Sequence, residues 1–385
     1  SKMIIRGGRI HDGNGRIYES DILVKDGQIV KIAKDIKDEE ETVVDANNKE
    51  IFPGFIQALS FWGINGSASE IRPSSQDNDE LSNPITPELD VRYAFNGHAA
   101  TTQQLGAFGL TTIGVTPTDN NLFGGTMAVF EVDGNNAFKM CLKPYAGMKA
   151  SVSEKVKNSY KAKAAPQTKM WIFQKLEEEL RKASVYKIED GKERDMKLEA
   201  VQKVVTGELP LFISCDNEQD IAHVKEIVEP YKDLKLVLCD GFGIKEDDTW
   251  VNDGKTSLVV RSASATMDST AMTLDLKAVA KLSEEGMPVA LSGVDSGFQI
   301  REDVLWLGIA MMKVMHDETK VLPMMTSTPA KLLGVFDKTG SIEEGKRADL
   351  VIWSDNPLET YSASIEATYM NGKVIYKKGD VMRCI

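Results

Sequence analysis

Short apolar runs that alternate with helical patterns constrain the fold more than any other feature of this chain. Strings of this kind, each a few residues long, are typical of strands buried on both faces, and helices between them predict parallel β/α units. The runs fall at residues 52–58, 110–115, 147–152, 209–214, 234–239, 257–260 and 288–292. They supply about seven of the eight strands that a closed (β/α)8 barrel needs. The remaining strand is expected near residues 125–132.

An open, doubly wound sheet is the competing architecture for such a pattern. That fold typically carries a Gly-x-Gly-x-x-Gly turn after an early strand, and this sequence has none. Gly124-Gly125 alone is too weak a signal to indicate a dinucleotide site. We therefore predict an α/β protein with a (β/α)8 TIM barrel over residues 53–339.

Both ends of the chain have the pattern of a β-protein. Two dipeptides, Asp26-Gly27 and Asn371-Gly372, lie between alternating apolar residues and predict two-residue hairpin turns. We expect residues 1–52 and 340–385 to build one composite β-sandwich domain beside the barrel.

Composition excludes several classes of function. The chain has 385 residues, of which 46 are basic and 58 acidic, and its net charge is −12. No stripe of Lys and Arg interleaved with aromatic residues is present, so no nucleic-acid partner is expected. No run of roughly 18 apolar residues is present either, so no membrane partner is expected. The four cysteines include no Cys-x-x-Cys pair, which indicates neither a zinc knuckle nor a disulfide framework and favours a reducing cytoplasm.

Two motifs carry a resemblance to a known family. One is Pro53-Gly54-Phe55-Ile56-Gln57-Ala58-Leu59-Ser60-Phe61, and the other is the C-terminal pair of segments 326–334 and 340–353. In order and spacing they resemble the amidohydrolase superfamily, and the prolidase-like and imidazolonepropionase-like bacterial members in particular. The first barrel strand of that family typically reads Pro-Gly-Phe-Ile-Asp-Ala-His-x-His, with both histidines binding a divalent metal. The resemblance implies a TIM barrel with a small β-domain and the hydrolysis of carbon–nitrogen bonds in small, non-peptide or dipeptide-like substrates.

The histidines that the resemblance would supply are absent. Leu59 and Phe61 stand at the first pair, Ser214 and Asp216 at a second His-x-His pair, and Asp240 where a further histidine ends the next strand. The chain has only four histidines, at positions 11, 98, 223 and 316, and none is in a His-x-His pair. Zinc sites need several imidazole and carboxylate ligands converging on one point. The chain is therefore expected to be a divergent member with a degenerate metal site and no metal cofactor, and Zn²⁺ or Mg²⁺ is disfavoured.

Three carboxylates remain at the predicted mouth, namely Asp216, Asp240 and Asp295. All should follow barrel strands at their C-terminal ends, where sites in this fold are built. They could act as general acid and base or hold one hard cation, or they could cap the following helices.

Four further residues are candidates for contacts with a substrate. Leu59 and Phe61 would make the mouth more apolar, which suits an organic ligand. Ser214 should point into the barrel, and Glu154 matches a Gly-Glu-Asn position of the relatives. Cys215 should point outward because side chains alternate along a strand.

Two functions follow from these observations. One is a hydrolase of carbon–nitrogen bonds with carboxylate-based chemistry, in which Asp295 or Asp240 activates water. The other is a catalytically inactive protein of the same fold that serves as a scaffold for a small-molecule ligand or a partner, since fold alone does not establish activity. Dimers are common among the relatives, so a homo-oligomer is compatible with either. Convergence of the three carboxylates in an open pocket would favour the hydrolase.

Overall fold

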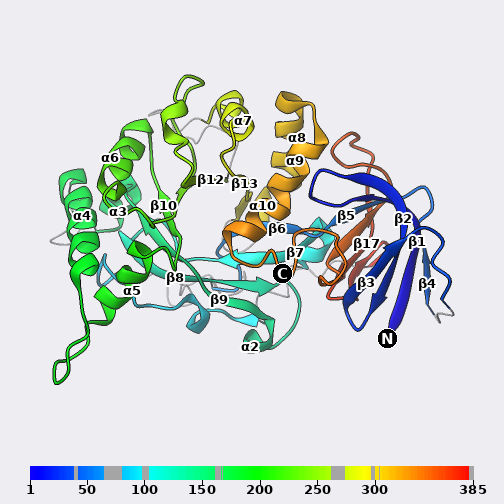
Figure 1. Ribbon diagram of the computed structural model, residues 1–385, viewed down its shortest axis with the longest axis horizontal. Helices are drawn as coiled ribbons and strands as arrows, with labels where there is room; N and C mark the ends of the chain where they lie inside the picture. Colours follow the sequence, from blue (N-terminus) through cyan, green and yellow to red (C-terminus); the bar gives the residue numbers. More distant parts are fainter. Residues whose placement is uncertain are drawn as a thin grey trace.

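Two eight-stranded sheets organise the molecule, as the computed structural model shows (Figure 1). It describes residues 1–38, 42–64, 80–97, 104–160, 166, 168–261, 274–295, 300–302 and 304–380, without the side chains of 294, 295 and 300–302. One sheet curves into a barrel surrounded by helices. The other is built from both ends of the chain and lies beside it.

The barrel sheet confirms the predicted α/β architecture. Its strand order is β6 to β13 in sequence, so every strand pairs with its neighbour along the chain. The strands are β6 (Phe55–Ser60), β7 (Leu110–Val115), β8 (Phe123–Glu131), β9 (Cys141–Ser151), β10 (Leu211–Ser214), β11 (Leu236–Cys239), β12 (Thr256–Val260) and β13 (Val289–Leu291). β6 and β7 are parallel, and so are β9 to β13.

Strand β8 departs from a uniform (β/α)8 pattern because it runs antiparallel to both β7 and β9. Its connections explain the direction. The chain passes from β7 to β8 through residues 116–122 and from β8 to β9 through residues 132–140. A parallel crossover needs a dozen or more residues, so both connections force the antiparallel arrangement. The expected strand near 125–132 is present, but without a crossover helix on either side.

A side chain joins the two ends of the barrel sheet. Ser292, which follows β13, accepts a hydrogen bond from the backbone N–H of Leu59 on β6 at 3.0 Å. Its hydroxyl also donates to the Leu59 carbonyl at 3.2 Å. This hydroxyl takes the place of a backbone partner for Leu59 and leaves the barrel nearly closed.

The helices cover the outside of the barrel. The longest of them, α4, buries Ile172, Leu176, Leu180 and Ala183, which recur at the spacing of one helical face. Side chains of Thr168, Asp195, Asn217 and Asp275 cap α4, α5, α6 and α7. The helices are α2 (Ala137–Met140), α3 (Glu154–Ser159), α4 (Lys169–Val185), α5 (Met196–Val205), α6 (Glu218–Val228), α7 (Leu276–Glu284), α8 (Val304–Met315), α9 (Glu318–Met325) and α10 (Ser327–Leu332). No helix in the described part of the chain is both long and apolar enough to cross a bilayer.

The terminal sheet has the order β18-β17-β16-β5-β1-β2-β3, and β4 also pairs with β1. Both predicted hairpin turns are present. Asp26 and Gly27 have φ of 50° and 83°, and Asn371 and Gly372 have φ of 51° and 77°, which is the positive pair that a type I′ turn requires. The strands are β1 (Lys2–His11), β2 (Ile17–Lys25), β3 (Gln28–Ala33), β4 (Val43–Asp45), β5 (Glu50–Pro53), β16 (Leu350–Trp353), β17 (Ile365–Met370) and β18 (Lys373–Lys377).

Candidate functional site

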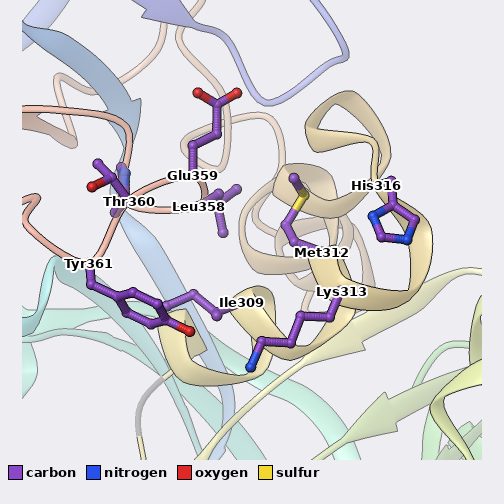
Figure 2. A pocket seen from close by; sticks show the side chains of 9 residues that line it. Ile309, Met312, Lys313, His316, Leu358, Glu359, Thr360 and Tyr361 are labelled. Atoms are coloured by element: carbon purple, nitrogen blue, oxygen red, sulfur yellow. The ribbon is translucent and has the colours of Figure 1, made fainter.

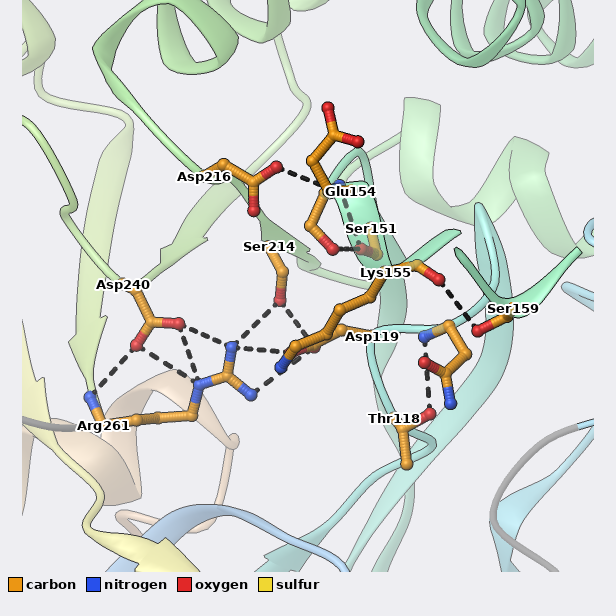
Figure 3. A network of polar contacts seen from close by, with 12 residues as sticks. Thr118, Asp119, Ser151, Glu154, Lys155, Ser159, Ser214, Asp216, Asp240 and Arg261 are labelled. Atoms are coloured by element: carbon orange, nitrogen blue, oxygen red, sulfur yellow. Dashed lines mark hydrogen bonds and ion pairs between the residues drawn. The ribbon is translucent and has the colours of Figure 1, made fainter. Parts of the chain in front are cut away.

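A network of charged and hydroxyl side chains occupies the C-terminal ends of five barrel strands. Figure 3 shows four of its members, Asp119, Ser214, Asp240 and Arg261. Asp119 follows β7, Lys149 lies on β9, Ser214 ends β10, Asp240 follows β11 and Arg261 follows β12. Each comes from a different strand, and the barrel geometry brings the strand ends to one face.

Asp119 is the centre of this network and is only 3% exposed. Its carboxylate lies 2.8 Å from Lys149 Nζ, 3.0 Å from Arg261 Nη2 and 3.4 Å from Lys155 Nζ. The Ser214 hydroxyl donates to the same carboxylate at 2.7 Å. Burial alone would raise the pKa of Asp119, but Arg261, Lys149 and Lys155 together hold that pKa well below 3.8. Asp119 is therefore an anion at neutral pH, and hydrogen-bond donors surround its carboxylate.

Lys149 is fully buried inside the barrel wall. Besides the ion pair with Asp119, its ammonium group donates to the Ala150 carbonyl at 2.8 Å and to Ser214 Oγ at 2.9 Å. A buried ammonium group is tolerated only with such a full set of partners. Lys149 therefore fixes both Asp119 and Ser214 in position.

Asp240 is bound by Arg261. The distances are 2.6 Å from Arg261 Nη2 and 3.1 Å from Nε to Oδ2 of Asp240. Burial would lower the pKa of Arg261, but Asp119 and Asp240 raise it well above the usual value. Asp240 therefore has a charge partner on its carboxylate and does not cap a helix.

Asp216 belongs to a second network. It accepts hydrogen bonds from the Glu154 backbone N–H at 2.7 Å and from Lys169 Nζ at 3.0 Å. Lys169 also contacts Asp220 at 2.8 Å. Burial lowers the pKa of Lys169, but its hydrogen bonds and charge interactions with Asp220 and Asp216 raise it overall. The cap of α6 is Asn217, so Asp216 does not cap that helix either.

Asp216 and Asp240 thus lie in two networks with different cations. The backbone of Asp295 forms part of β14 (Val294–Asp295), and its side chain lies outside the described residues. Convergence of the three carboxylates stays a prediction.

The candidate contact residues differ in their surroundings. Leu59 is buried in the cluster of apolar side chains that includes Phe212 and Val259, and Phe61 packs against the larger core outside it. Ser214 points inward, as its contacts with Lys149 and Asp119 show. Glu154 begins α3, and its exposed carboxylate pairs with Lys157 at 2.8 Å.

The cysteines of the barrel are buried thiols. Cys215 packs in the outer core, as alternation along β10 predicted, and burial raises its pKa well above 9.0. Cys239 lies in the inner cluster, where burial raises its pKa to about 11. Neither thiol is poised as a nucleophile. Cys141 is half-buried, and Cys384 lies outside the described residues.

The donor set at the described strand ends does not fit a divalent metal. Two buried cations, Lys149 and Arg261, stand beside the carboxylates of Asp119 and Asp240 that would have to bind the ion. A metal ion would meet like charges and would compete for oxygens that already accept hydrogen bonds. Within the described ranges, no three His, Cys, Asp or Glu residues are grouped in a way that could hold one.

Sequence reasoning missed Asp119, Lys149 and Arg261. The rule that selected Asp240 could have found Asp119 and Arg261, since both also follow a barrel strand. Lys149 had no such signal, because a lysine within a strand is usually exposed.

Two cavities lie away from these networks. One, of 420 Å³, lies between α8 and residues 357–361, and Met312, His316 and Tyr361 are among its lining residues (Figure 2). The other, of 550 Å³, lies at the opposite ends of β9 to β12. None of the seven candidate residues from the sequence lines either cavity.

Comparison with known proteins supports the family resemblance. Residues 220–376 match the model of the amidohydrolase family. Imidazolonepropionase of Thermoplasma acidophilum is 29% identical over 106 residues, which cover 26% of each chain. The match therefore spans about a quarter of that relative's length.

Solved structures extend the similarity to nearly the whole chain. An amidohydrolase from Thermotoga maritima has a TM-score of 0.87 at 24% identity, covering 98% of this chain and all of the other. An adenosine deaminase from Xanthomonas campestris, solved with bound zinc, has a TM-score of 0.57 at 13% identity, covering 97% of this chain and 92% of the other. The chain thus matches the amidohydrolase family model over residues 220–376 and shares the fold of the Thermotoga maritima amidohydrolase over nearly its whole length.

Proposed function

We propose that the chain is an amidohydrolase-fold protein in which the usual metal-dependent hydrolysis has been lost and a small organic molecule is bound at the barrel mouth. One observation carries the proposal: the ammonium group of Lys149 and the guanidinium group of Arg261 meet on the buried carboxylate of Asp119. These cations stand at the strand ends where the family resemblance implies a metal.

The charges of this network support the proposal. Lys149 and Arg261 balance Asp119 and Asp240 within one set of contacts of 3.0 Å or less. A divalent cation would add two uncompensated positive charges to a buried, neutral cluster. The network thus stabilises the mouth in the way a structural metal would.

A carboxylate-based hydrolase is less well supported. A general base works best when its pKa lies near the working pH. Asp119 has a pKa well below its usual value, and Asp240 is held by the guanidinium group of Arg261. Asp119 is therefore a poor acceptor for a proton from water, and the carboxylate of Asp240 is already occupied by Arg261.

A second candidate is a metal-free hydrolase of carbon–nitrogen bonds that uses Ser214. Its hydroxyl oxygen lies 2.9 Å from Lys149 Nζ and 2.7 Å from Asp119 Oδ1. Ser214 Oγ would attack the carbonyl carbon of an amide, and its proton would pass to the amide nitrogen, which would leave as the amine; Asp119 would only orient the hydroxyl group. Water would then release the acyl group. Ser214 is only 2% exposed, so a substrate would reach it only after the mouth opens.

Metal analysis tests the first candidate. Protein purified without chelators is incubated with Zn²⁺, Mn²⁺ or Mg²⁺, freed of excess ion and analysed for metal by mass spectrometry. We expect far less than one ion per chain, with no change in the melting temperature. One tightly held ion per chain would overturn the proposal.

Ligand and activity measurements separate the two candidates. Native mass spectrometry of the purified chain and a thermal-shift screen of small organic acids and amides report binding, and the same amides are assayed for hydrolysis. Binding without turnover supports the scaffold. Turnover that Ser214→Ala abolishes, while Ser283→Ala on α7 leaves it intact, would establish the second candidate instead.

A further inference from the structure

The 550 Å³ cavity lies at the end of the barrel opposite the proposed mouth site. Tyr145 and Ala146 near the start of β9, Pro210 just before β10, and Ser257 on β12 contribute to its wall. Leu332 of α10 closes another side. Its volume is within the range of about 300–1,000 Å³ that small-molecule sites occupy.

Five lysines line this cavity, although the chain as a whole is acidic. They are Lys143, Lys232, Lys235, Lys255 and Lys331. Two carboxylates, Glu208 and Asp233, line it as well, so five positive and two negative groups leave an excess of three positive charges. The whole chain has a net charge of −12, which makes this excess a local exception.

These lysines lack charge partners among the described residues. None of the five ammonium groups is within 4.0 Å of a carboxylate there; Lys143 is half-buried, and the other four lysines are exposed. Lys255 donates to the Lys232 carbonyl at 2.8 Å, and Lys143 reaches the Gly334 carbonyl at 3.4 Å. Lys331 lies over the ring of Phe336 at 4.6 Å. Clustered, unpaired ammonium groups repel one another and raise the local concentration of anions.

From the volume, the charge excess and the unpaired lysines we propose that this cavity binds a small phosphate-bearing anion of more than one negative charge. Lysine ammonium groups bind phosphate as point charges, with three donors each. Tyr145, Pro210 and Leu332 offer an apolar wall for an organic part of such a molecule. The site is separate from the network around Asp119, so it does not depend on what the mouth does.

Calorimetry with pyrophosphate tests the proposal on the full chain. Pyrophosphate is titrated at low and at physiological salt into the parent and into the double variant Lys232→Gln/Lys235→Gln. Both lysines are exposed, so the replacements should not disturb the fold. We expect binding by the parent and at least a tenfold loss of affinity in the variant.

A matched control separates a site from general charge screening. The variant Lys187→Gln/Lys277→Gln removes the same charge from exposed positions that do not line the cavity. It should bind pyrophosphate as the parent does, and inorganic sulfate should compete weakly. No binding by the parent, or an equal loss in both double variants, would overturn the proposal. Lys331→Gln on α10, titrated in the same way, is a second and independent test of the same site.

Discussion

The mouth of this barrel depends on individual residues whose charges compensate one another. Lys149, Asp119 and Arg261 are far apart in sequence but meet through contacts of 2.8 and 3.0 Å. Removing one member of a buried set of charges leaves the others without compensation, which costs more than the intact set contributes. The network is therefore sensitive to single substitutions.

Replacing Lys149 with Met should destabilise the fold strongly. The substitution leaves the buried carboxylate of Asp119 with fewer partners, at a cost on the order of 3 kcal/mol. Lys155→Met is the matched control, because its side chain is 58% exposed although it contacts the same carboxylate. Its effect should stay below about 1 kcal/mol. Urea unfolding followed by circular dichroism measures both, and equal effects would contradict the assignment.

Acid should remove part of the stability through Asp119. The pKa of this carboxyl is lower in the folded chain than its ordinary value of 3.8, because Arg261, Lys149 and Lys155 outweigh the effect of burial. Its contribution is therefore present in full above the unfolded pKa and is lost as pH falls through the folded value. The free energy of unfolding should decrease as the pH is lowered below about 4. In Asp119→Asn the free energy of unfolding should decrease less steeply with falling pH than in the parent. Parallel curves of unfolding free energy against pH would count against the charge assignment.

At the scale of elements, the sequence predicts most strands because apolar runs bounded by helical patterns report burial on both faces. It does not predict the direction of β8, which depends on the short connections 116–122 and 132–140 and not on the strand's own residues. The site is predicted less well. Ser214, Asp216 and Asp240 are visible as polar residues at strand ends, whereas the pairing of Lys149 with Asp119 depends on how distant strands meet in the barrel.

The contact between β13 and β6 gives a prediction for the barrel's closure. The Ser292 hydroxyl bonds both backbone groups of Leu59, so Ser292→Ala should cost about 1–2 kcal/mol. The amide of Leu59 should then exchange with solvent faster than in the parent, as measured by hydrogen exchange with mass spectrometry. Ser283→Ala on α7 serves as the control. Unchanged exchange at Leu59 would show that this hydrogen bond does not hold β13 and β6 together.

For the whole molecule, the terminal sheet and the barrel are joined by buried polar contacts as well as by the chain. His11 of β1 is hydrogen-bonded to Glu318 of α9, and Asn356 donates to the same carboxylate at 2.7 Å. On the other side, Arg347 pairs with Glu131 of β8 at 2.7 Å. The predicted division into residues 1–52 with 340–385 and residues 53–339 therefore need not produce two independently unfolding units.

Scanning calorimetry tests this coupling. We expect a single transition in the parent, with equal calorimetric and van't Hoff enthalpies, because the buried contacts at Glu318 and Glu131 make the two sheets unfold together. Glu318→Ala removes the acceptor for both His11 and Asn356 and should lower the midpoint by several degrees, since hydrogen bonds to a charged group contribute about 1.5–3 kcal/mol. Glu284→Ala, where the carboxylate is half exposed and pairs with Lys320 at 3.7 Å, should leave the midpoint nearly unchanged. Two separate transitions in the parent would mean that the terminal sheet and the barrel are independent domains despite these contacts.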